Sequence, residues 1–277
     1  EPTTDPAPAA APPPPRHLFG TAAFAPREIA ARVQDVGVAK ARLPLLTLAL
    51  LGVLAGAFIG LGSLMFTLVA ADASLGLAAQ RLLGGLAFSL GLVLVTVAGA
   101  ELFTGNNLLA MAWAARRLSS GEVLRNWLVA GLANLVGAAG VALLAFRAGH
   151  GALNGGAGGE TVQRVALAKV ELPPAEAFFR GVLCNVLVCM AVWMAMAGRS
   201  VVDKVVAVVF PITAFVAAGF EHSIANLYFF PLAVLLGAPI TPAEMAANLV
   251  PVIAGNIVGG SVLVALVYWV IYLRPAR

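Results

Sequence analysis

Three ionisable residues lie deep inside apolar runs of this 277-residue chain. Glu101 and Glu221 are the only acidic residues within such runs, and His222 is the only histidine there. An ionisable group at membrane depth is costly, so it is by default a functional candidate that needs a partner. A neutral imidazole both donates and accepts hydrogen bonds, and it exchanges a proton near neutral pH. His222 is therefore the leading candidate for chemistry on a small acid or anion.

Both glutamates stand where an apolar run is interrupted. Glu101 is followed by Thr104 and Asn106, and Glu221 is followed by Asn226. The simplest interpretation is local, because backbone N–H groups freed at a helix break need acceptors and half-helices need caps. Glu101 and Glu221 as acceptors, and Asn106 and Asn226 as caps of the half-helices, are thus expected to support the breaks. The hydroxyl of Thr104 can bond the imidazole, a passing ligand or its own backbone.

The composition decides which solvent surrounds the elements that position these residues. The chain is 61% hydrophobic and 11% charged, whereas soluble chains are about 45–50% apolar and about 25% charged. A soluble enzyme is therefore excluded. The basic residues that give the net charge of +4 are scattered between apolar runs, which indicates membrane topology rather than nucleic-acid binding.

The chain shows no metal-ligand spacing, nucleophile elbow or phosphate loop. We expect no enzyme activity, no metal and no cofactor. Cys184 and Cys189 face different directions on one helix, so they predict no disulfide framework.

Six transmembrane helices are expected, because six apolar runs reach the length of about 20 residues that a crossing needs. The runs are 43–71, 82–115, 126–146, 177–198, 205–236 and 245–273, and the second and fifth are interrupted. A Gly-rich connector (149–160) separates the third from the fourth. Gly52, Gly56 and Gly60 have the small-residue spacing that suits close helix contact.

The N-terminal part is expected to lie outside the membrane. Residues 1–25 are rich in Pro and Ala and predict a disordered tail. Residues 26–42 predict a cytoplasmic amphipathic helix at the membrane surface, and residues 43–277 a transmembrane channel domain. Six crossings place both termini on one side, where 12 of the 17 basic residues then fall, and this bias indicates cytoplasmic termini.

The two halves of the chain repeat weakly. Gly, Glu and Asn of GAELFTGNN (99–107) recur in GFEHSIAN (219–226) at an offset of 120, and NLVG at 134–137 recurs as NIVG at 256–259. The first and fourth spans show no clear match. Each half has three crossings, so the second half is inverted relative to the first. Interrupted spans at matching positions of inverted halves indicate a binding site near the membrane midplane.

These motifs resemble the formate/nitrite transporter family over nearly all of residues 27–274. The resemblance implies an aquaporin-like shape and a homopentamer with a pore in each protomer, in a bacterial-type inner membrane. The stretches that carry it are GAELFTGNN (99–107), NWLVAGLANLVG (126–137), RGVLCNVLVCMAVWMA (180–195), GRSVVDK (198–204), GFEHSIAN (219–226) and GNIVGGSVLVALVYWVIYLR (255–274).

The resemblance also implies roles for single residues. His222 is similar to the central pore histidine, Thr104 to the threonine of the loop that breaks the second span, and Lys169 to a vestibule lysine 16 residues before Asn185. Two hydrophobic constrictions are implied. Their residues are Phe88, Leu92, Leu102, Phe103, Val188 and Phe215. Gly-Asn-Asn after Thr104 departs from the best-known formate channels, and residues 180–189 look closer to nitrite channels.

We expect a pH-dependent channel or transporter for small monovalent weak-acid anions, formate first, with nitrite and hydrosulfide as alternatives. An isolated carboxylate costs tens of kcal/mol to move into low dielectric, whereas the protonated acid is neutral. Lys169 would attract the anion, and a proton from His222, or from water assisted by His222, would neutralise it. The expected partners are the anion, protons and lipid. The alternative is a neutral-solute channel of the water or glycerol kind, although its paired Asn-Pro-Ala motifs are absent.

Overall fold

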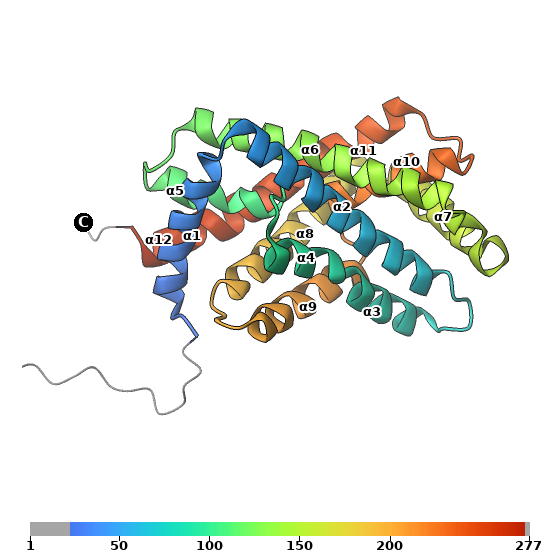
Figure 1. Cartoon of the computed structure of the whole chain (residues 1–277), viewed down its shortest axis with the longest axis horizontal. Helices are drawn as coiled ribbons and strands as arrows, with labels where there is room; N and C mark the ends of the chain where they lie inside the picture. The colour runs from blue at the N-terminus through green and yellow to red at the C-terminus, as the bar shows by residue number, and fades with distance from the viewer. Residues whose placement is uncertain (1–22, 275–277) are drawn as a thin grey trace, which may run out of the picture.

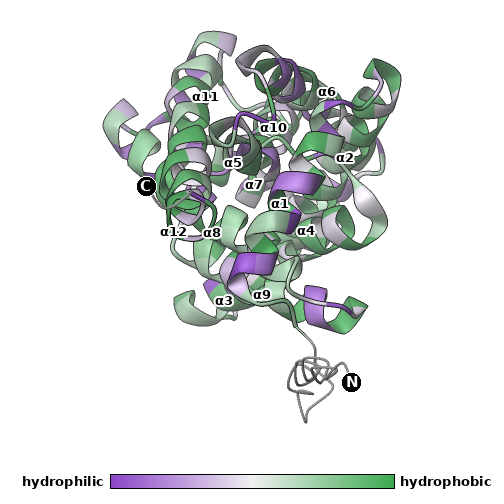
Figure 2. Ribbon diagram, turned by 90° about the vertical axis from the view of Figure 1, so that its left-hand side faces the viewer, coloured by the Kyte–Doolittle hydropathy of each residue, from purple (hydrophilic) through white to green (hydrophobic). Residues whose placement is uncertain are grey.

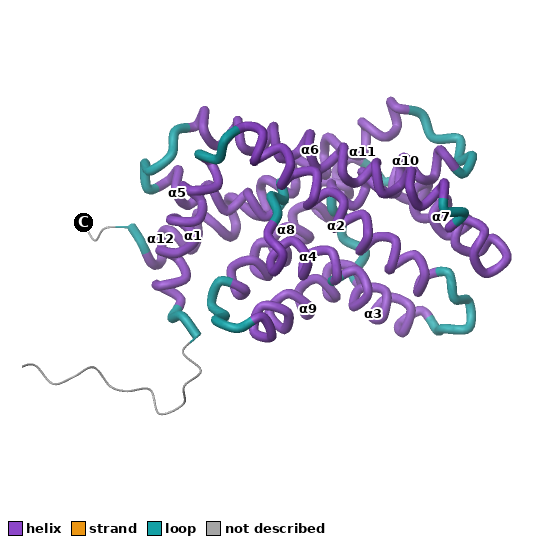
Figure 3. The backbone as a smooth tube through the Cα atoms, in the orientation of Figure 1, coloured by secondary structure: helices purple, strands orange, loops and turns teal. Residues whose placement is uncertain are grey.

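The structure, a computed structural model, describes residues 23–274, and every regular element within that range is helical (Figure 1, Figure 3). Residues 1–22 of the expected tail lie outside the described residues. Five helical stretches are long and apolar enough to cross a membrane. They are Leu45–Ala70, Leu77–Gly99, Ser120–Arg147, Pro174–Ala195 and Pro242–Tyr272. The prediction of an all-α chain with membrane-capable helices is confirmed.

The elements follow the predicted spans closely. Those of the first half are α1 (Pro26–Ala41), α2 (Leu45–Ala70), α3 (Leu77–Phe88), α4 (Leu90–Leu94), the π-helix η1 (Val95–Gly99), the 3₁₀-helix η2 (Gly105–Leu109), α5 (Ala110–Ala114) and α6 (Ser120–Arg147). Those of the second half are the 3₁₀ segment η3 (His150–Gly156), α7 (Ala157–Val170), α8 (Pro174–Ala195), α9 (Val201–Ala217), α10 (Ser223–Leu235), α11 (Pro242–Ile257), the π-helix η4 (Val258–Leu266) and α12 (Val267–Tyr272).

Two helix breaks occur where the glutamates predict them. Non-helical backbone covers residues 100–104 in the second span and 218–222 in the fifth, so the fifth span consists of two shorter helices, α9 and α10. Gly99 and Gly219 have φ angles of +87° and +72° at the two breaks. Glycine adopts this left-handed conformation without the penalty of a Cβ atom. The two breaks therefore use the same backbone device, 120 residues apart.

Helix α1 is amphipathic as predicted, but its apolar face does not lie on lipid. Ile29, Ala30 and Val33 are buried, and α1 contacts α5, η2 and α12. Figure 1 shows α1 beside α5 and α12. Phe24, just before the helix, donates its backbone N–H to the carbonyl of Ala197 at 3.0 Å. The expected surface helix is therefore packed on the protein, because that face finds apolar partners there.

Helix α7 is absent from the sequence prediction, which assigns residues 149–160 to a connector and no element to the rest of this helix. It buries Val162 and Ala166 and packs against α10, α11 and α2. Its composition is too polar for a membrane span, so apolar-run length does not reveal it. Its last turn carries Lys169.

Glycines bring the long helices into backbone contact. A Cβ on Gly56 of α2 would collide with the carbonyl of Asn134 on α6, and a Cβ on Gly137 of α6 would collide with the carbonyl of Val53. A Cβ on Gly255 of α11 would collide in the same way with the carbonyl of Phe178 on α8. The predicted close contact at the Gly52–Gly56–Gly60 stripe is confirmed. The pairs α2–α6 and α8–α11 form the rigid frame around the breaks.

Large apolar side chains cover the outside of this frame. Leu46, Leu144, Phe210 and Val250 are all strongly exposed. Figure 2 shows a largely hydrophobic ribbon with hydrophilic segments on α1. Such a surface is typical of a chain whose outer helices meet lipid or other subunits.

Candidate transport site

The two breaks bring Thr104 and His222 into contact at the centre of the molecule. Oγ1 of Thr104 lies 3.0 Å from Nε2 of His222. Both side chains are buried, with exposures of 0% and 2%. Thr104 ends the first break, and His222 ends the second and caps α10. Residues 118 positions apart thus meet in a hydrogen bond.

The second ring nitrogen of His222 fixes the direction of that bond. Nδ1 accepts the backbone N–H of Ala225 at 3.1 Å, in the manner of a helix N-cap. A neutral imidazole with one accepting nitrogen carries its proton on the other. Nε2 therefore holds the N–H and donates it to the oxygen of Thr104. The site presents a hydrogen-bond donor, not a cation, to whatever lies beside it.

Aromatic rings enclose the imidazole. The ring of Phe215 stacks on His222 with centroids 5.8 Å apart and planes inclined by 22°. Phe88 meets both rings edge-on. Its ring centroid lies 6.5 Å from that of His222 and 5.5 Å from that of Phe215. Leu92 is buried nearby, one helical turn from Phe88. An ionised molecule receives little solvation from such walls.

Two cavities approach this centre from opposite ends of the same helices. The first, of about 530 Å³, is lined by the C-terminal end of α8 at Met196 and the start of α9 at Lys204. The second, of about 550 Å³, is lined by the N-terminal end of α8 at Arg180 and the end of α9 at Phe215. Since each helix meets one cavity at one end and the other at its opposite end, the cavities open on opposite sides.

The barrier between the cavities is thin. Leu92 and Leu102 line the first cavity, whereas Phe88, Phe215 and His222 line the second. Phe88 and Leu92 are four residues apart, which corresponds to about 6 Å along a helix. Roughly one helical turn of apolar side chains therefore separates the two cavities.

Each cavity contains a lysine–glutamate ion pair. Nζ of Lys40 lies 2.9 Å from Oε1 of Glu101 in the first cavity, and Nζ of Lys169 lies 2.8 Å from Oε1 of Glu221 in the second. The glutamates, which the sequence places at the breaks, therefore pair with lysines rather than with freed backbone N–H groups. Lys40 is missing from the sequence-predicted residues. The repeat in the sequence has offsets of 120 and 122, so it does not point to Lys40, which lies 129 residues before Lys169.

The predicted caps at Asn106 and Asn226 are wrong. Asn106 donates to Glu101 at 2.8 Å and to the side-chain oxygen of Asn126 at 2.9 Å. Asn226 lies inside α10, whose cap is His222, and it makes the same two kinds of bond, to Glu221 and Asn248. Both asparagines hold the glutamates in place, because each glutamate needs donors for its second oxygen.

A second pair of asparagines holds the break backbones. Asn134 donates to the carbonyls of Gly52 and Glu101 and accepts the N–H of Phe103. Asn256 does the same for Gly181, Glu221 and Ser223. The two carbonyls bonded in this way outside the breaks belong to Gly52 of α2 and Gly181 of α8, which are 129 residues apart.

The other predicted residues separate into two groups. Phe88, Leu92, Leu102 and Phe215 line the cavities. Asn185, Val188 and Phe103 are buried but line neither cavity. Nδ2 of Asn185 lies 3.2 Å from the carbonyl of Thr104, so Asn185 supports the loop from behind. Phe103 packs against Trp127 with centroids 6.4 Å apart.

Potential metal ligands do not gather in the described part of the chain. Within residues 23–274, no group of three or more His, Cys, Asp or Glu side chains is placed to hold a metal ion. Cys184 and Cys189 are both buried free thiols.

Comparison with known proteins gives consistent matches. The family profile described as "Formate/nitrite transporter" matches residues 27–270. The formate channel FocA of Escherichia coli K12 is 38% identical over 269 residues, which cover 90% of this chain and 94% of FocA. A probable formate transporter of Methanothermobacter thermautotrophicus is 38% identical over 274 residues, which cover 92% of this chain and all of that protein.

Solved structures with the same fold are also found. An FNT family ion channel superposes with a TM-score of 0.81 at 33% identity, covering 90% of this chain and 99% of that one. A pentameric formate channel with formate bound gives a TM-score of 0.75 at 36% identity, covering 83% and 98%. These relatives are channels and transporters, in agreement with the expectation that this chain is not an enzyme. The chain therefore belongs to the formate/nitrite transporter family of membrane proteins.

Proposed function

We propose that the chain is a transmembrane channel for small monovalent weak-acid anions, with formate as its main substrate and nitrite and hydrosulfide as further candidates. The observation that carries this proposal is the buried contact between Thr104 and His222 at the end of a cavity, one turn away from the opposite cavity. Relatives at 38% identity include formate channels, which favours formate.

Both cavities attract anions. The first is lined by Arg32, Lys40 and Lys204 and by one acidic residue, Glu101. The second is lined by four basic and two acidic residues. These are Arg81, Arg164, Lys169, Arg180, Glu160 and Glu221. A cavity with excess positive charge and low-dielectric walls concentrates anions. Sulfate and phosphate carry too much charge for the apolar turn beyond it.

The substrate crosses the apolar turn as the neutral acid. The anion reaches His222, and Nε2–H donates a hydrogen bond to its oxygen in place of Thr104. A proton from cavity water then binds the carboxylate oxygen, the neutral acid moves past Phe88 and Leu92, and the proton returns to water on the other side. Nδ1 stays committed to the Ala225 N–H, so the imidazole assists as a donor while water supplies the proton.

The proposed topology has six crossings in two inverted repeats and an aquaporin-like shape. Its support is the network of Lys, Glu and Asn contacts, which occurs once at each break. Residues 43–277 form the channel domain, and residues 26–42 lie on the cytoplasmic side with both termini, following the distribution of basic residues. The location is a bacterial-type inner membrane.

The proposed assembly is a homopentamer in which each protomer has its own pore. A pentameric formate channel is among the structural neighbours, at 36% identity. Both cavities and the Thr104–His222 contact lie within one chain. Each protomer is therefore sufficient to form a complete path.

Flux measurements on proteoliposomes test the proposal. Formate, nitrite, hydrosulfide and acetate are compared between pH 5 and pH 8, and we expect formate flux that rises as the pH falls. His222→Phe should reduce the formate flux at every pH, because it removes the Nε2–H that holds the anion, whereas His150→Phe, the same change in η3, should leave the flux intact. Unchanged flux in His222→Phe would exclude a role of His222 in transport. Glycerol swelling without formate flux would instead identify a neutral-solute channel.

A further inference from the structure

A third cavity lies outside the transport path, on the surface beside α1 and α12. It has a volume of about 810 Å³ and is lined by the loop between α5 and α6 and by the start of α6. We name it the arginine groove after the residues that line it, which include Arg42, Arg116, Arg117, Glu122, Trp113 and Trp269. We propose that the arginine groove binds the headgroup of an anionic phospholipid.

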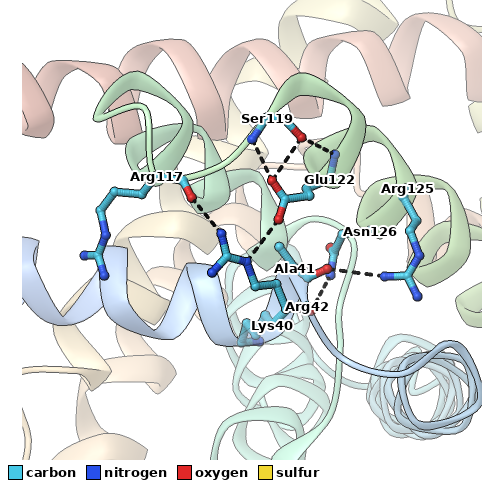
Figure 4. Close-up of polar contacts among 8 residues, drawn as sticks. All are labelled: Lys40, Ala41, Arg42, Arg117, Ser119, Glu122, Arg125 and Asn126. Carbon is cyan, nitrogen blue, oxygen red and sulfur yellow. Dashed lines mark hydrogen bonds and ion pairs between the residues drawn. The ribbon is translucent and has the colours of Figure 1, made fainter.

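The charges of the groove leave one guanidinium available. Arg42 is engaged, because it pairs with Glu122 at 3.0 Å and donates to the carbonyl of Arg117 at 3.2 Å (Figure 4). Arg117 pairs with Asp35 at 2.7 Å. Within residues 23–274, no ion pair or side-chain hydrogen bond involves the guanidinium of Arg116. Guanidinium groups bind phosphate with two parallel hydrogen bonds.

The backbone presents Arg116 in an unusual way. Its φ angle is +58°, in the left-handed region that non-glycine residues rarely adopt. The N–H of Arg116 bonds the carbonyl of Trp113, and the N–H of Arg117 bonds that of Ala112, each at 2.9 Å. This turn ends α5 where glycine is the usual residue. The backbone at this position favours glycine, which has no side chain, yet the residue is an arginine. This argues for a role of the arginine side chain itself.

The groove also has an apolar side. Trp113 is 45% exposed and donates its indole N–H to Ser120 at 3.0 Å. Trp269 of α12 also lines the groove, and Leu124 on α6 and Val267 and Val270 on α12, two or fewer residues from lining residues, are exposed. Tryptophan is enriched where membrane meets water. Arginines next to an apolar helix surface fit a phospholipid, whose phosphate binds the arginines while its acyl chains contact the apolar surface. A free phosphate would make no contact with the apolar surface.

Native mass spectrometry on the purified full-length chain tests this proposal. The protein is titrated with phosphatidylglycerol and, separately, with phosphatidylcholine. We expect retention of phosphatidylglycerol, and Arg116→Gln should weaken it about fivefold, as one lost basic residue near a lipid surface predicts. Arg116→Lys should keep most of the binding. Arg147→Gln, the same change at the other end of α6, is the matched control and should bind as the wild type does.

A second variant keeps the test valid if Arg116→Gln folds poorly. Arg116→Gly relieves the left-handed backbone, so in phosphatidylcholine it should unfold at the same or a higher temperature than the wild type. It should nevertheless lose the extra stability that phosphatidylglycerol gives. Equal competition by inorganic phosphate would show a free-anion site and overturn the proposal. So would a lipid-independent change of assembly mass in the Arg116 variants, which would show a contact between copies of the chain.

Discussion

Lys40 and Lys169 hold matching positions at the two helix breaks. Each forms an ion pair with the glutamate of its break, at 2.9 Å and 2.8 Å. The backbone carbonyl of each accepts a hydrogen bond from an asparagine, Asn126 for Lys40 and Asn248 for Lys169. Lys40 lies in the last turn of α1 and Lys169 in the last turn of α7, so each break is supported by a lysine at the end of a helix outside the interrupted span.

Replacing Lys40 by Gln should destabilise the protein. The change leaves the carboxylate of Glu101 buried without its cation. The loss should be about 1–3 kcal/mol, below the ~3–5 kcal/mol of a fully buried pair, because the Lys40 side chain is 28% exposed. Thermal unfolding in a fixed detergent measures it. Adding Glu101→Gln should recover part of the lost stability. If the double variant instead loses the sum of the two single losses, Lys40 and Glu101 do not stabilise the fold as a pair.

Replacing Lys169 by Gln should reduce formate uptake from the side of the second cavity, and more strongly at high pH. At high pH the substrate is almost entirely anionic, so capture depends on charge. We expect a reduction of about tenfold at low ionic strength, which salt should diminish. Initial rates in proteoliposomes measure the effect. Lys204→Gln, which alters the first cavity, is the control, and an equal effect of both changes at every pH would contradict a local role for Lys169.

The hydroxyl of Thr104 should matter more than its shape. Thr104→Val removes the oxygen that accepts the Nε2–H of His222 and leaves a buried donor unsatisfied, at a cost of about 1–3 kcal/mol. Formate flux and thermal stability should both fall. Thr104→Ser keeps the oxygen and should retain most of the flux. Equal behaviour of the two variants would mean that the 3.0 Å contact has no role in transport.

The close packing of α2 on α6 gives a prediction with a built-in control. Gly56→Ala forces a Cβ against the carbonyl of Asn134, so it should destabilise by about 1–3 kcal/mol. Gly140→Ala, also within a helix, meets no atom within 4 Å. It should stabilise by up to about 1 kcal/mol, because alanine is the better helix former. Thermal unfolding of both variants tests this. If Gly56→Ala is as stable as Gly140→Ala, close backbone contact is not the reason for glycine at position 56.

Much of the site is predictable from the sequence, because ionisable groups inside apolar runs are rare. Glu101, Glu221 and His222 are conspicuous for that reason, and the structure brings His222 to Thr104. The ion-pair partner Lys40 is not conspicuous, since a lysine at the end of an amphipathic helix is ordinary. Its offset of 129 from Lys169 also differs from the repeat offsets of 120 and 122, so the repeat does not reveal it.

The remaining differences concern which way a side chain faces. Asn185 and Val188 are buried on α8 and line neither cavity, and Asn185 bonds the carbonyl of Thr104. A uniformly apolar helix carries no periodic signal that separates the path side from the packing side. The caps predicted at Asn106 and Asn226 fail for a related reason. The side-chain amides of the two asparagines donate to the buried carboxylates of Glu101 and Glu221 instead of capping a helix. A sequence pattern does not show which of these two partners an asparagine takes.

The thin apolar turn between Phe88 and Leu92 has an electrical consequence. In the proposed transport path, water that fills both cavities would make nearly the whole membrane voltage fall across this turn rather than along the full length of the path. A translocated elementary charge would exchange about 2.3 kcal/mol with the field for every 100 mV. A neutral acid exchanges none, so its net rate would follow the concentration gradients of acid and proton and carry no current.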